Sequence, residues 1–504
     1  MELHDVSKDE STAHRAVEVR QTTDHHSPVV PSSRCGLERP SLVVVGVASK
    51  TPAPRGVSFR SLTHPHEPDR GITYTSSRRM PYPSTLVGDA SVHVSVADYE
   101  PEGLDVLMRL YYPTERPPPS EWSLSRPRFM PRFDYLHGLA HFLLDLEKRP
   151  WWFRTLARLT CLFAFAATEA HATIPASIDA SPHATNGPMP VVVFSHGLAG
   201  NRNMYAGLCT SMASRGYLVA AIEHRDGSAS CAATLRKTDG GETRVTYRPY
   251  LHTDGDFGWR REQIAVRVRE MEAAIDALSA AAHAPTSQLS TAGADARDGG
   301  KGAPPPPRNV FPGSRFDPAT QLRGRVDVSR LVAAGHSFGG ATVLSAMSKN
   351  PRVRRAVMLD PWTEPFGPCS SPAHPLVRAA ASGVPTAVVN SETWAGADMR
   401  PFYREARAPW IEAIVAGTKH QDVSDVPLRA PMTAKTIGMK GTTDSHKTLD
   451  LTSHVIDVFL AVLDRAGDGG DAGVARELHD EVLGLTQAFK NDVSVALRSP
   501  AAGR

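Results

Sequence analysis

The chain has 504 residues, of which 41% are hydrophobic and 22% are charged, values that are ordinary for soluble globular proteins. A chain of this length and composition can bury a sizeable core, either in several domains or in one long α/β domain with flanking segments. The 56 basic and 53 acidic residues leave a net charge of only +3, which gives no broad basic surface, so no nucleic-acid partner is expected.

The cysteines and the first residues indicate the compartment. The five cysteines are far apart and show no CxxC spacing, which predicts free thiols rather than a metal site or a disulfide framework. The sequence begins Met1-Glu2-Leu3 and continues with polar and charged residues. It therefore has neither the apolar stretch of a secretory signal nor the second-position glycine that N-myristoylation needs. We expect a cytoplasmic protein, peripheral to membranes at most.

A tail and two strands begin the chain. Residues 1–83 are rich in Ser, Thr, His, Pro and charge, which predicts a disordered N-terminal tail. A folded domain is expected over residues 84–465. It opens with two strand-like runs, an alternating one at residues 91–96 and an apolar one at residues 106–112 that Pro113 should end.

An apolar segment with two arginines follows at residues 151–165. Arg154 and Arg158 stand one helical turn apart among aromatic and aliphatic residues, which favours an amphipathic helix at a membrane or lipid aggregate. The segment is too short and too charged to span a bilayer. The alternative is a helix whose apolar face is packed on the core of the domain.

Short apolar runs separated by helix-length stretches make up the rest of the domain. A buried parallel sheet requires this pattern, because helices cover both of its faces. We therefore predict an α/β fold with a mostly parallel central sheet flanked by helices. The predicted strands are residues 191–194, 217–222, 331–334, 356–359, 386–389 and 414–415, and the predicted helices are residues 204–215, 262–281, 340–348 and 454–463.

Two biased segments stand apart from this pattern. Residues 283–318 are rich in Ala, Gly and Asp and include four consecutive prolines, which predicts a low-complexity insertion loop. Residues 466–473 are rich in Gly and Asp, which predicts a linker to a last helix near residues 474–497. Residues 466–504 are thus expected to form a linker and a C-terminal helix.

The strongest chemical signal is a G-x-S-x-G motif around Ser337. The sequence Gly335-His336-Ser337-Phe338-Gly339-Gly340 lies between a predicted strand and a predicted helix. A sharp strand-to-helix turn presents such a serine at a helix N-terminus and needs glycines where a Cβ would collide with its neighbours. We therefore predict that Ser337 is a nucleophile; the alternative is a glycine-rich turn with an incidental serine.

The order of the chain selects the partners of this serine. In a triad on this fold the acid follows the serine at the end of the next strand, and the histidine comes later. Asp360 ends the run at 356–359, so it is the predicted acid, with a strand-capping turn aspartate as the alternative. His420 follows the last predicted strand and is the predicted general base. The other histidines after Asp360 are His374, His446, His454 and His479, which lie too early or in polar and helical stretches.

An oxyanion hole needs two backbone N–H donors near the nucleophile. One should come from the glycine-rich loop at residues 196–200, which follows an early strand, and the other from the residue after the serine. We assign the donors to the N–H groups of Leu198 and Phe338. His196 precedes the serine in the chain and is expected to support the loop rather than to act as a base.

Several segments carry a resemblance to one known family. They are Leu110-Tyr111-Tyr112-Pro113, residues 192–198, residues 219–226, residues 335–343 and Asn390-Ser391-Glu392. They resemble the platelet-activating factor acetylhydrolase family of the α/β-hydrolase superfamily, specifically the plasma and intracellular type II enzymes, which are calcium-independent group VII phospholipases A2. The resemblance extends over residues 86–463. One departure stands beside the acid, where Pro361 replaces the alanine of the family's Leu-Asp-Ala-Trp segment.

The resemblance implies an activity and a site. The family's triad positions correspond to Ser337, Asp360 and His420. The implied reaction is hydrolysis of the sn-2 acetyl or short or oxidised acyl ester of a phospholipid, which releases a lysophospholipid and a carboxylic acid without a metal or another cofactor. Two alternatives share the same residues: a carboxylesterase or lipase that acts on other esters, and an inactive hydrolase scaffold that binds a protein partner.

Overall fold

The computed structural model describes most of the chain after the predicted tail. The described residues are 92–120, 123, 125–167, 172–183, 187–234, 243–248, 257–284, 316–369, 371–395, 399–466, 474, 477–478, 480–481, 484 and 492–498. The predicted disordered tail and nearly all of the predicted insertion at 283–318 lie outside these residues.

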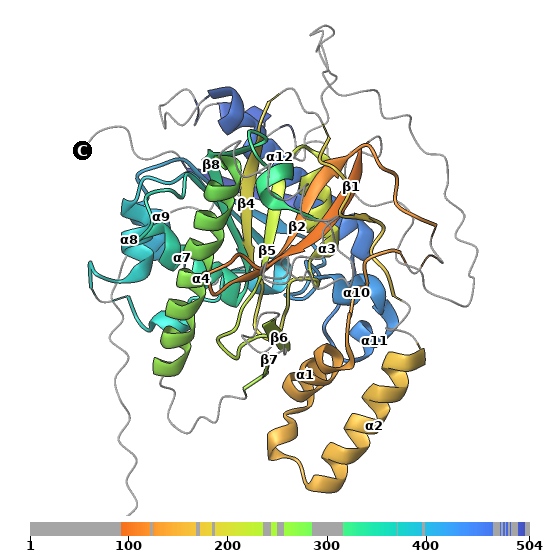
Figure 1. Cartoon of the computed structure of the whole chain (residues 1–504). Helices are drawn as coiled ribbons and strands as arrows, with labels where there is room; N and C mark the ends of the chain where they lie inside the picture. Colours follow the sequence, from red (N-terminus) through yellow and green to blue (C-terminus); the bar gives the residue numbers. More distant parts are fainter. Residues whose placement is uncertain are drawn as a thin grey trace, which may run out of the picture. The chain divides into compact units, whose positions relative to one another are not determined.

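A ten-stranded, mostly parallel sheet forms the centre of the fold (Figure 1), which confirms the predicted α/β class. Its strand order is β12-β11-β10-β9-β8-β4-β5-β2-β1-β3. The six strands from β11 to β5 in this order run parallel, whereas β12, β2 and β1 each pair antiparallel with a neighbour. The strands are β1 (His93–Tyr99), β2 (Leu107–Thr114), β3 (Ser177–Ile178), β4 (Met189–Ser195), β5 (Leu218–Glu223), β6 (Cys231–Thr234), β7 (Thr243–Thr246), β8 (Val326–His336), β9 (Arg355–Leu359), β10 (Thr386–Ser391), β11 (Trp410–Val415) and β12 (Val493–Arg498).

Helices cover both faces of the sheet because the central strands are apolar on both sides. All of β4 is buried, and its side chains alternate between two cores: Val192 joins one core with α3 and α12, and Val193 joins the other with α4, α7 and α8. Figure 1 shows α4 and α7 in front of the sheet. The helices are α1 (Phe133–Leu144), α2 (Trp151–Ala167), α3 (Ala206–Ser214), α4 (Gly258–Ala282), α6 (Pro318–Gln321), α7 (Phe338–Met347), α8 (Pro375–Ala381), α9 (Arg400–Glu405), α10 (Asp425–Arg429), α11 (Pro431–Thr436) and α12 (Ser445–Ala466).

Every predicted strand and helix of the central region is present; most ends are shifted by a few residues, whereas α12 begins at Ser445, well before the predicted residue 454. The prediction that Pro113 ends its strand is wrong, since Pro113 lies inside β2 and pairs with Val94. The Pro113 carbonyl accepts a hydrogen bond from the His183 N–H, so this residue turns its backbone groups away from β1. The missing N–H costs no ladder bond there, because the pairing of β2 with β5 has already ended at Tyr111.

The predicted C-terminal helix is wrong at its end. The positions described between 474 and 484 are helical, but Val493–Arg498 is a strand that pairs antiparallel with β11. Its segment Val-Ser-Val-Ala-Leu has the alternation and β-branched residues of a strand. Without it, the backbone N–H and C=O groups of β11 that point away from β10 would be unpaired. The last described segment therefore belongs to the central sheet.

Two further observations concern thiols and membrane spans. Within the described residues, Cys161, Cys209, Cys231 and Cys369 are all free, and Cys35 lies outside them. Among the helices that the structure describes, none combines the length and the hydropathy needed to cross a bilayer.

Candidate active site

Ser337 lies in a sharp turn between β8 and α7, and glycines make the turn possible. Its backbone has φ 56° and ψ −115°, a conformation that a residue with a side chain rarely adopts. A Cβ added to Gly335 would lie 2.5 Å from the Gly339 carbonyl oxygen, and one added to Gly339 would lie 1.9 Å from that of Ser195. The motif therefore forms a strained strand-to-helix turn, in which neighbouring backbone atoms leave no space for a side chain at Gly335 or Gly339.

The end of β9 fixes the acid beside this turn. The Ser337 N–H donates to the Leu359 carbonyl oxygen at 2.9 Å, and the Trp362 N–H donates to the Ser337 carbonyl oxygen at 3.0 Å. Asp360 adopts φ 42°, and its N–H donates to the Val389 carbonyl oxygen on β10. The proline that departs from the family segment leaves Asp360 directly beside the serine turn.

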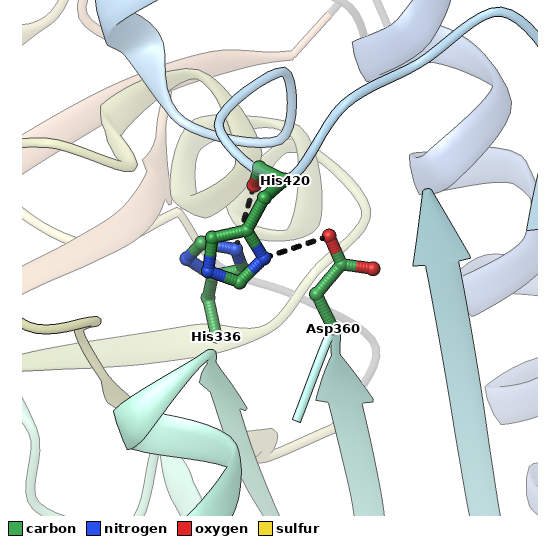
Figure 2. Close-up of side chains that lie close together, drawn as sticks. All are labelled: His336, Asp360 and His420. Carbon is green, nitrogen blue, oxygen red and sulfur yellow. Dashed lines mark hydrogen bonds and ion pairs between the residues drawn. The ribbon is translucent and has the colours of Figure 1, made fainter. Parts of the chain in front are cut away.

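His420 bridges the serine and the acid. Its Nε2 lies 2.9 Å from the Ser337 Oγ, and its Nδ1 lies 3.1 Å from the Asp360 Oδ2. Figure 2 shows the imidazole turned toward the Asp360 carboxylate. Because a carboxylate only accepts, Nδ1 carries the proton and Nε2 is free to accept the serine proton. The structure thus brings together the three residues that the sequence singles out.

The other histidines considered from the sequence lie elsewhere. His374 caps α8, and His446 and His454 lie on α12. His479 lies outside the described residues.

Asp360 and His420 differ in how far their side chains are buried. The Asp360 side chain is fully buried, and it also accepts hydrogen bonds from the Ser391 N–H and the Ser391 hydroxyl at 2.6 and 2.7 Å. These two donors hold the carboxylate in a fixed orientation. The His420 side chain keeps 22% of its surface exposed, so a substrate can reach it. Trp394 stacks on its ring with 3.9 Å between centroids, which restricts the ring to one plane.

The predicted oxyanion donors lie beside Ser337. A Cβ added to Gly197 would lie 3.3 Å from the Ser337 Cβ, so the loop at 196–200 abuts the serine. Phe338 is the first residue of α7, where backbone N–H groups have no partner within the helix. Within the described part of the chain, neither the Leu198 nor the Phe338 N–H meets an acceptor. Both amides are therefore available to an oxygen placed between them.

His196 forms hydrogen bonds that fix this loop. Its Nδ1 lies 2.7 Å from the Gly197 carbonyl oxygen, and its Nε2 accepts from the His224 N–H at 3.3 Å. Burial, followed by the nearby Arg267 guanidinium, lowers the pKa of His196 well below its ordinary value. A neutral imidazole has one N–H and one lone pair, which matches these two contacts.

One group of possible metal ligands occurs among the described residues, formed by His336, Asp360 and His420. Each of its histidine nitrogens already faces a protein group. His420 uses both nitrogens within the triad, and His336 faces the Tyr205 hydroxyl at 2.7 Å and the His420 carbonyl oxygen at 2.9 Å. A cation would have to displace these hydrogen bonds, so the arrangement favours proton transfer over coordination.

Sequence reasoning missed Ser391, Trp394, Tyr205 and His336 as members of the site. His336 lies inside the serine motif, and Ser391 lies in a segment that resembles the family. The motif positions are thus the one signal that points to these two residues. Tyr205 and Trp394 carry no such signal, because only the folded chain brings them to the triad.

Comparison with known proteins gives the following matches. Residues 86–468 match the family model "Platelet-activating factor acetylhydrolase, isoform II". A platelet-activating factor acetylhydrolase from Canis lupus familiaris is 29% identical over 374 residues, which cover 72% of each chain. One from Bos taurus is 28% identical over 416 residues, which cover 80% of this chain and 82% of the relative. A ferulic acid esterase structure from Streptomyces cinnamoneus superposes with a TM-score of 0.45 and 17% identity, covering 76% of this chain and 92% of that one.

Proposed function

Because the chain belongs to the platelet-activating factor acetylhydrolase, isoform II, family and is therefore a hydrolase of phospholipid esters, we propose that it cleaves the sn-2 ester with Ser337 as nucleophile. The substrate class is a phospholipid whose sn-2 acyl chain is an acetyl group or a short or oxidised chain. The products are a lysophospholipid and a carboxylic acid. No metal or other cofactor takes part in the proposed steps.

Acylation begins with a proton transfer. His420 Nε2 takes the proton of the Ser337 hydroxyl as its oxygen attacks the ester carbonyl. Asp360, which accepts from Nδ1, keeps the imidazole in the required tautomer and stabilises the imidazolium that forms. The negative charge on the carbonyl oxygen is stabilised by the N–H groups of Leu198 and Phe338. The imidazolium then protonates the leaving lysophospholipid oxygen, and an acyl-enzyme remains.

Deacylation repeats these steps with water. His420 removes a proton from a water molecule, whose oxygen attacks the acyl-enzyme carbonyl, and Ser337 leaves with that proton. The same two amides stabilise the second oxyanion. One observation supports the whole cycle above the rest: the unbroken chain of hydrogen bonds from Asp360 through His420 to Ser337, beside two N–H groups that have no acceptor among the described residues.

Release of the sn-2 acid tests this function. Phosphatidylcholines with an sn-2 acetyl chain and with a long sn-2 chain are incubated with the wild type and with Ser337→Ala, in the presence of chelator. We expect chelator-resistant release from the acetyl substrate and none with the variant. Activity confined to simple carboxylic esters would identify a general esterase instead. A wild type whose Ser337 is not labelled by a fluorophosphonate would indicate an inactive scaffold.

We also propose that α2 contacts the lipid aggregate that carries the substrate. Six large apolar side chains of α2 are exposed: Trp151, Trp152, Leu156, Leu159, Leu162 and Phe163. Trp151 and Phe163 are 73% and 76% exposed, values far above those of a helix packed on a core. At 100° per residue the six side chains fall on one side of the helix, within roughly 140° of its circumference. Such a contiguous apolar face is unfavourable in water and favourable at a lipid interface.

The opposite side of α2 is already occupied, which supports the assignment of the exposed side to lipid. Ala157 is buried, and the Phe165 ring packs edge-on against Phe133 of α1 with 6.4 Å between centroids. At the same 100° per residue, Arg158 falls between Phe165 and the exposed face, where its guanidinium group can reach the phosphates of a lipid surface. The helix therefore has one apolar face for α1 and a second one for the membrane.

Vesicle binding tests this second proposal. Sedimentation with phosphatidylcholine vesicles compares the wild type with the double variant Trp151→Ala/Phe163→Ala, while hydrolysis of a monomeric soluble ester serves as the control. We expect the variant to lose vesicle binding and hydrolysis of vesicle-borne substrate but to keep the soluble activity. Equal sedimentation of the two proteins would reject this role of α2.

The cytoplasm is the location that we propose. The free thiols of the described residues support it, since a reducing compartment keeps such thiols unpaired. Cell fractionation with a disulfide-bonded secreted protein as marker tests this location. Recovery of the chain with that marker would contradict it.

A further inference from the structure

A second chain of hydrogen bonds lies beside Ser337, Asp360 and His420. It joins the loop at residues 196–200 to the loop that carries His420. The Gly197 N–H points at the Tyr205 hydroxyl oxygen at 3.2 Å, and this hydroxyl lies 2.7 Å from the His336 Nδ1. On the other side of the ring, the His336 Nε2 lies 2.9 Å from the backbone carbonyl oxygen of His420. Tyr205 and His336 are 4% and 1% exposed, so water does not compete for these contacts.

The donor and acceptor groups of these residues allow only one direction of donation along the hydrogen-bond chain. The His420 carbonyl can only accept, so His336 Nε2 carries the proton and Nδ1 presents a lone pair. Tyr205 therefore donates its hydroxyl proton to Nδ1, and its oxygen accepts from the Gly197 N–H. Burial, followed by the proximity of His420, lowers the pKa of His336 well below its ordinary value, which agrees with a neutral ring.

We propose that Tyr205 and His336 are positioning residues that hold the oxyanion loop and the loop of the general base in register with Ser337. The proposal rests on the proposed function, because it assigns how that site is assembled. Neither residue touches the substrate; each acts through Gly197 or His420.

The oxyanion end depends on both backbone groups of Gly197. Its N–H is fixed by Tyr205, and its carbonyl oxygen accepts from His196 Nδ1 and from the Gly200 N–H at 2.7 and 3.0 Å. The Leu198 N–H belongs to the peptide plane that contains this carbonyl, so fixing Gly197 aims the Leu198 donor. The Tyr205 hydroxyl holds the preceding peptide plane, so without it one of the three hydrogen bonds that fix Gly197 is lost.

The base end depends on the neutral state of His336. Its ring lies 4.6 Å from the His420 ring, at an interplanar angle of 37° (Figure 2). His420 becomes a cation each time it takes the serine proton, and a second cation at this distance would oppose that step. A neutral His336 avoids the repulsion while its Nε2–H fixes the backbone of His420.

Four variants test the proposal. Tyr205→Phe removes only the hydroxyl, and Tyr112→Phe is the matched control, since the Tyr112 hydroxyl is also buried and donates to a backbone carbonyl, that of Ala180, away from the site. His336→Leu removes both contacts of the ring, whereas His336→Gln keeps an N–H near the position of Nε2. Steady-state kinetics on the acetyl phospholipid, the labelling rate of Ser337 by a fluorophosphonate, and the affinity for a trifluoromethyl ketone are measured for each.

A positioning role predicts a particular set of changes. For Tyr205→Phe we expect kcat to fall about 10- to 100-fold with KM within about threefold of the wild type, because a misplaced donor weakens the transition state alone. The labelling rate and the trifluoromethyl ketone affinity should fall with kcat. His336→Leu should lose more activity than His336→Gln, which restores the donation to His420.

Three outcomes would overturn the proposal. They are a kcat for Tyr205→Phe within about twofold of that for Tyr112→Phe, a loss that appears in KM alone, and equal losses for His336→Leu and His336→Gln. Failure of the proposed function is recognised separately, since the wild type would then release no sn-2 acid in a Ser337-dependent way. The labelling rates would still compare the variants in that case.

Discussion

The backbone of Asp360 has two features that rarely occur together: it precedes a proline, and it adopts a positive φ of 42°. Three hydrogen bonds to its backbone N–H and its carboxylate hold it in this conformation beside His420. Such strain persists only where the surroundings over-determine it. The Cβ that Gly340 lacks would lie 2.8 Å from the Pro361 Cα, so the proline packs directly on the helix that follows the serine. The substitution in the family segment thus fills a space next to a glycine.

Removing the charge of Asp360 should abolish most of the activity. An amide at this position would present a donor or a neutral oxygen to His420 Nδ1, and the imidazole would lose the tautomer that leaves Nε2 free. We expect Asp360→Asn to lower kcat by roughly 10⁴-fold with little change in KM, as in other serine triads. Asp327→Asn, on the partly exposed start of β8, is the control and should keep wild-type kinetics. Retention of a tenth of the activity would contradict the assignment of the acid.

The glycines of the serine turn give a second prediction at this scale. Gly339→Ala would place a Cβ 1.9 Å from the Ser195 backbone oxygen, which cannot move aside as a side chain can. We expect loss of fluorophosphonate labelling and a lower melting temperature. Gly187→Ala meets no atom within 4 Å and should be neutral in both measurements. A labelled, stable Gly339→Ala protein would show that the turn is less tight than described.

The residues of the triad differ from their neighbours in how they can be predicted. Ser337, Asp360 and His420 follow from one motif and from the order of strands, since the carboxyl ends of parallel strands meet at one edge of a sheet. Tyr205 and Trp394 enter the site through tertiary contacts that join distant parts of the chain. No spacing rule contains such contacts, so they become visible only in the structure.

At the scale of elements, apolar runs predicted the central strands well but did not predict the C-terminal strand β12. The central strands are buried on both faces, and their unbroken hydrophobicity is a strong signal. The alternation of 493–497 is equally strand-like, but it follows a helical stretch, and its partner β11 is about 80 residues earlier in the chain. Helix α2 was expected, but the sequence could not tell which of its sides is exposed and which is packed on the domain, because both sides are apolar.

Helix α1 attaches this helical pair to the site by contacts that the sequence did not indicate. The Tyr135 hydroxyl on α1 donates to the Glu223 carboxylate and accepts from an Arg202 N–H at 2.8 Å. A Cβ added to Gly138 would lie 1.7 Å from the Ser230 backbone oxygen, so α1 packs directly on the residue that precedes β6. Ser230 in turn donates its N–H to Gly200 of the oxyanion loop. Helix α2, which we propose to contact lipid, is thus attached through α1 to the predicted oxyanion loop.

Deleting the last strand gives a prediction at the scale of elements. Removal of residues 492–504 takes away β12 and leaves the backbone groups of β11 open to other chains. We expect a lower melting temperature and concentration-dependent aggregation, measured by thermal unfolding and light scattering. Removal of residues 499–504, which begin after the strand, is the control and should change neither. Equal behaviour of the two truncations would mean that β12 does not protect the sheet edge.

At the scale of the whole molecule, buried neutral histidines make stability depend on pH. His196 and His336 are each about 1% exposed, and burial lowers both pKa values well below 6.5. Each ring has one nitrogen facing a carbonyl oxygen and the other facing an N–H or O–H donor. A second proton on either ring would therefore point at a donor, so the folded state disfavours the protonated form. In the unfolded chain both histidines can be protonated.

The sign of the effect follows from proton linkage. Below about pH 6.5 the unfolded chain binds protons at these histidines that the folded protein does not, so the free energy of unfolding falls as the pH falls. The loss from each histidine approaches about 1.4 kcal/mol per pH unit well below pH 6.5. The contribution to stability is fully present above about pH 7.5 and is lost progressively as the pH falls toward the lowered pKa values of the folded state.

Urea unfolding of matched variants tests this dependence. His196→Asn keeps an N–H that can donate to the Gly197 carbonyl but has no proton to gain, so its stability should change less between pH 7.5 and 5.5 than that of the wild type. We expect the two pH differences to differ by about 1 kcal/mol. His283→Gln, at an exposed helix end, should keep the wild-type dependence. If His196→Asn also keeps it, the buried ring takes up a proton in the folded state, and the one-directional hydrogen bonds around it would have to rearrange.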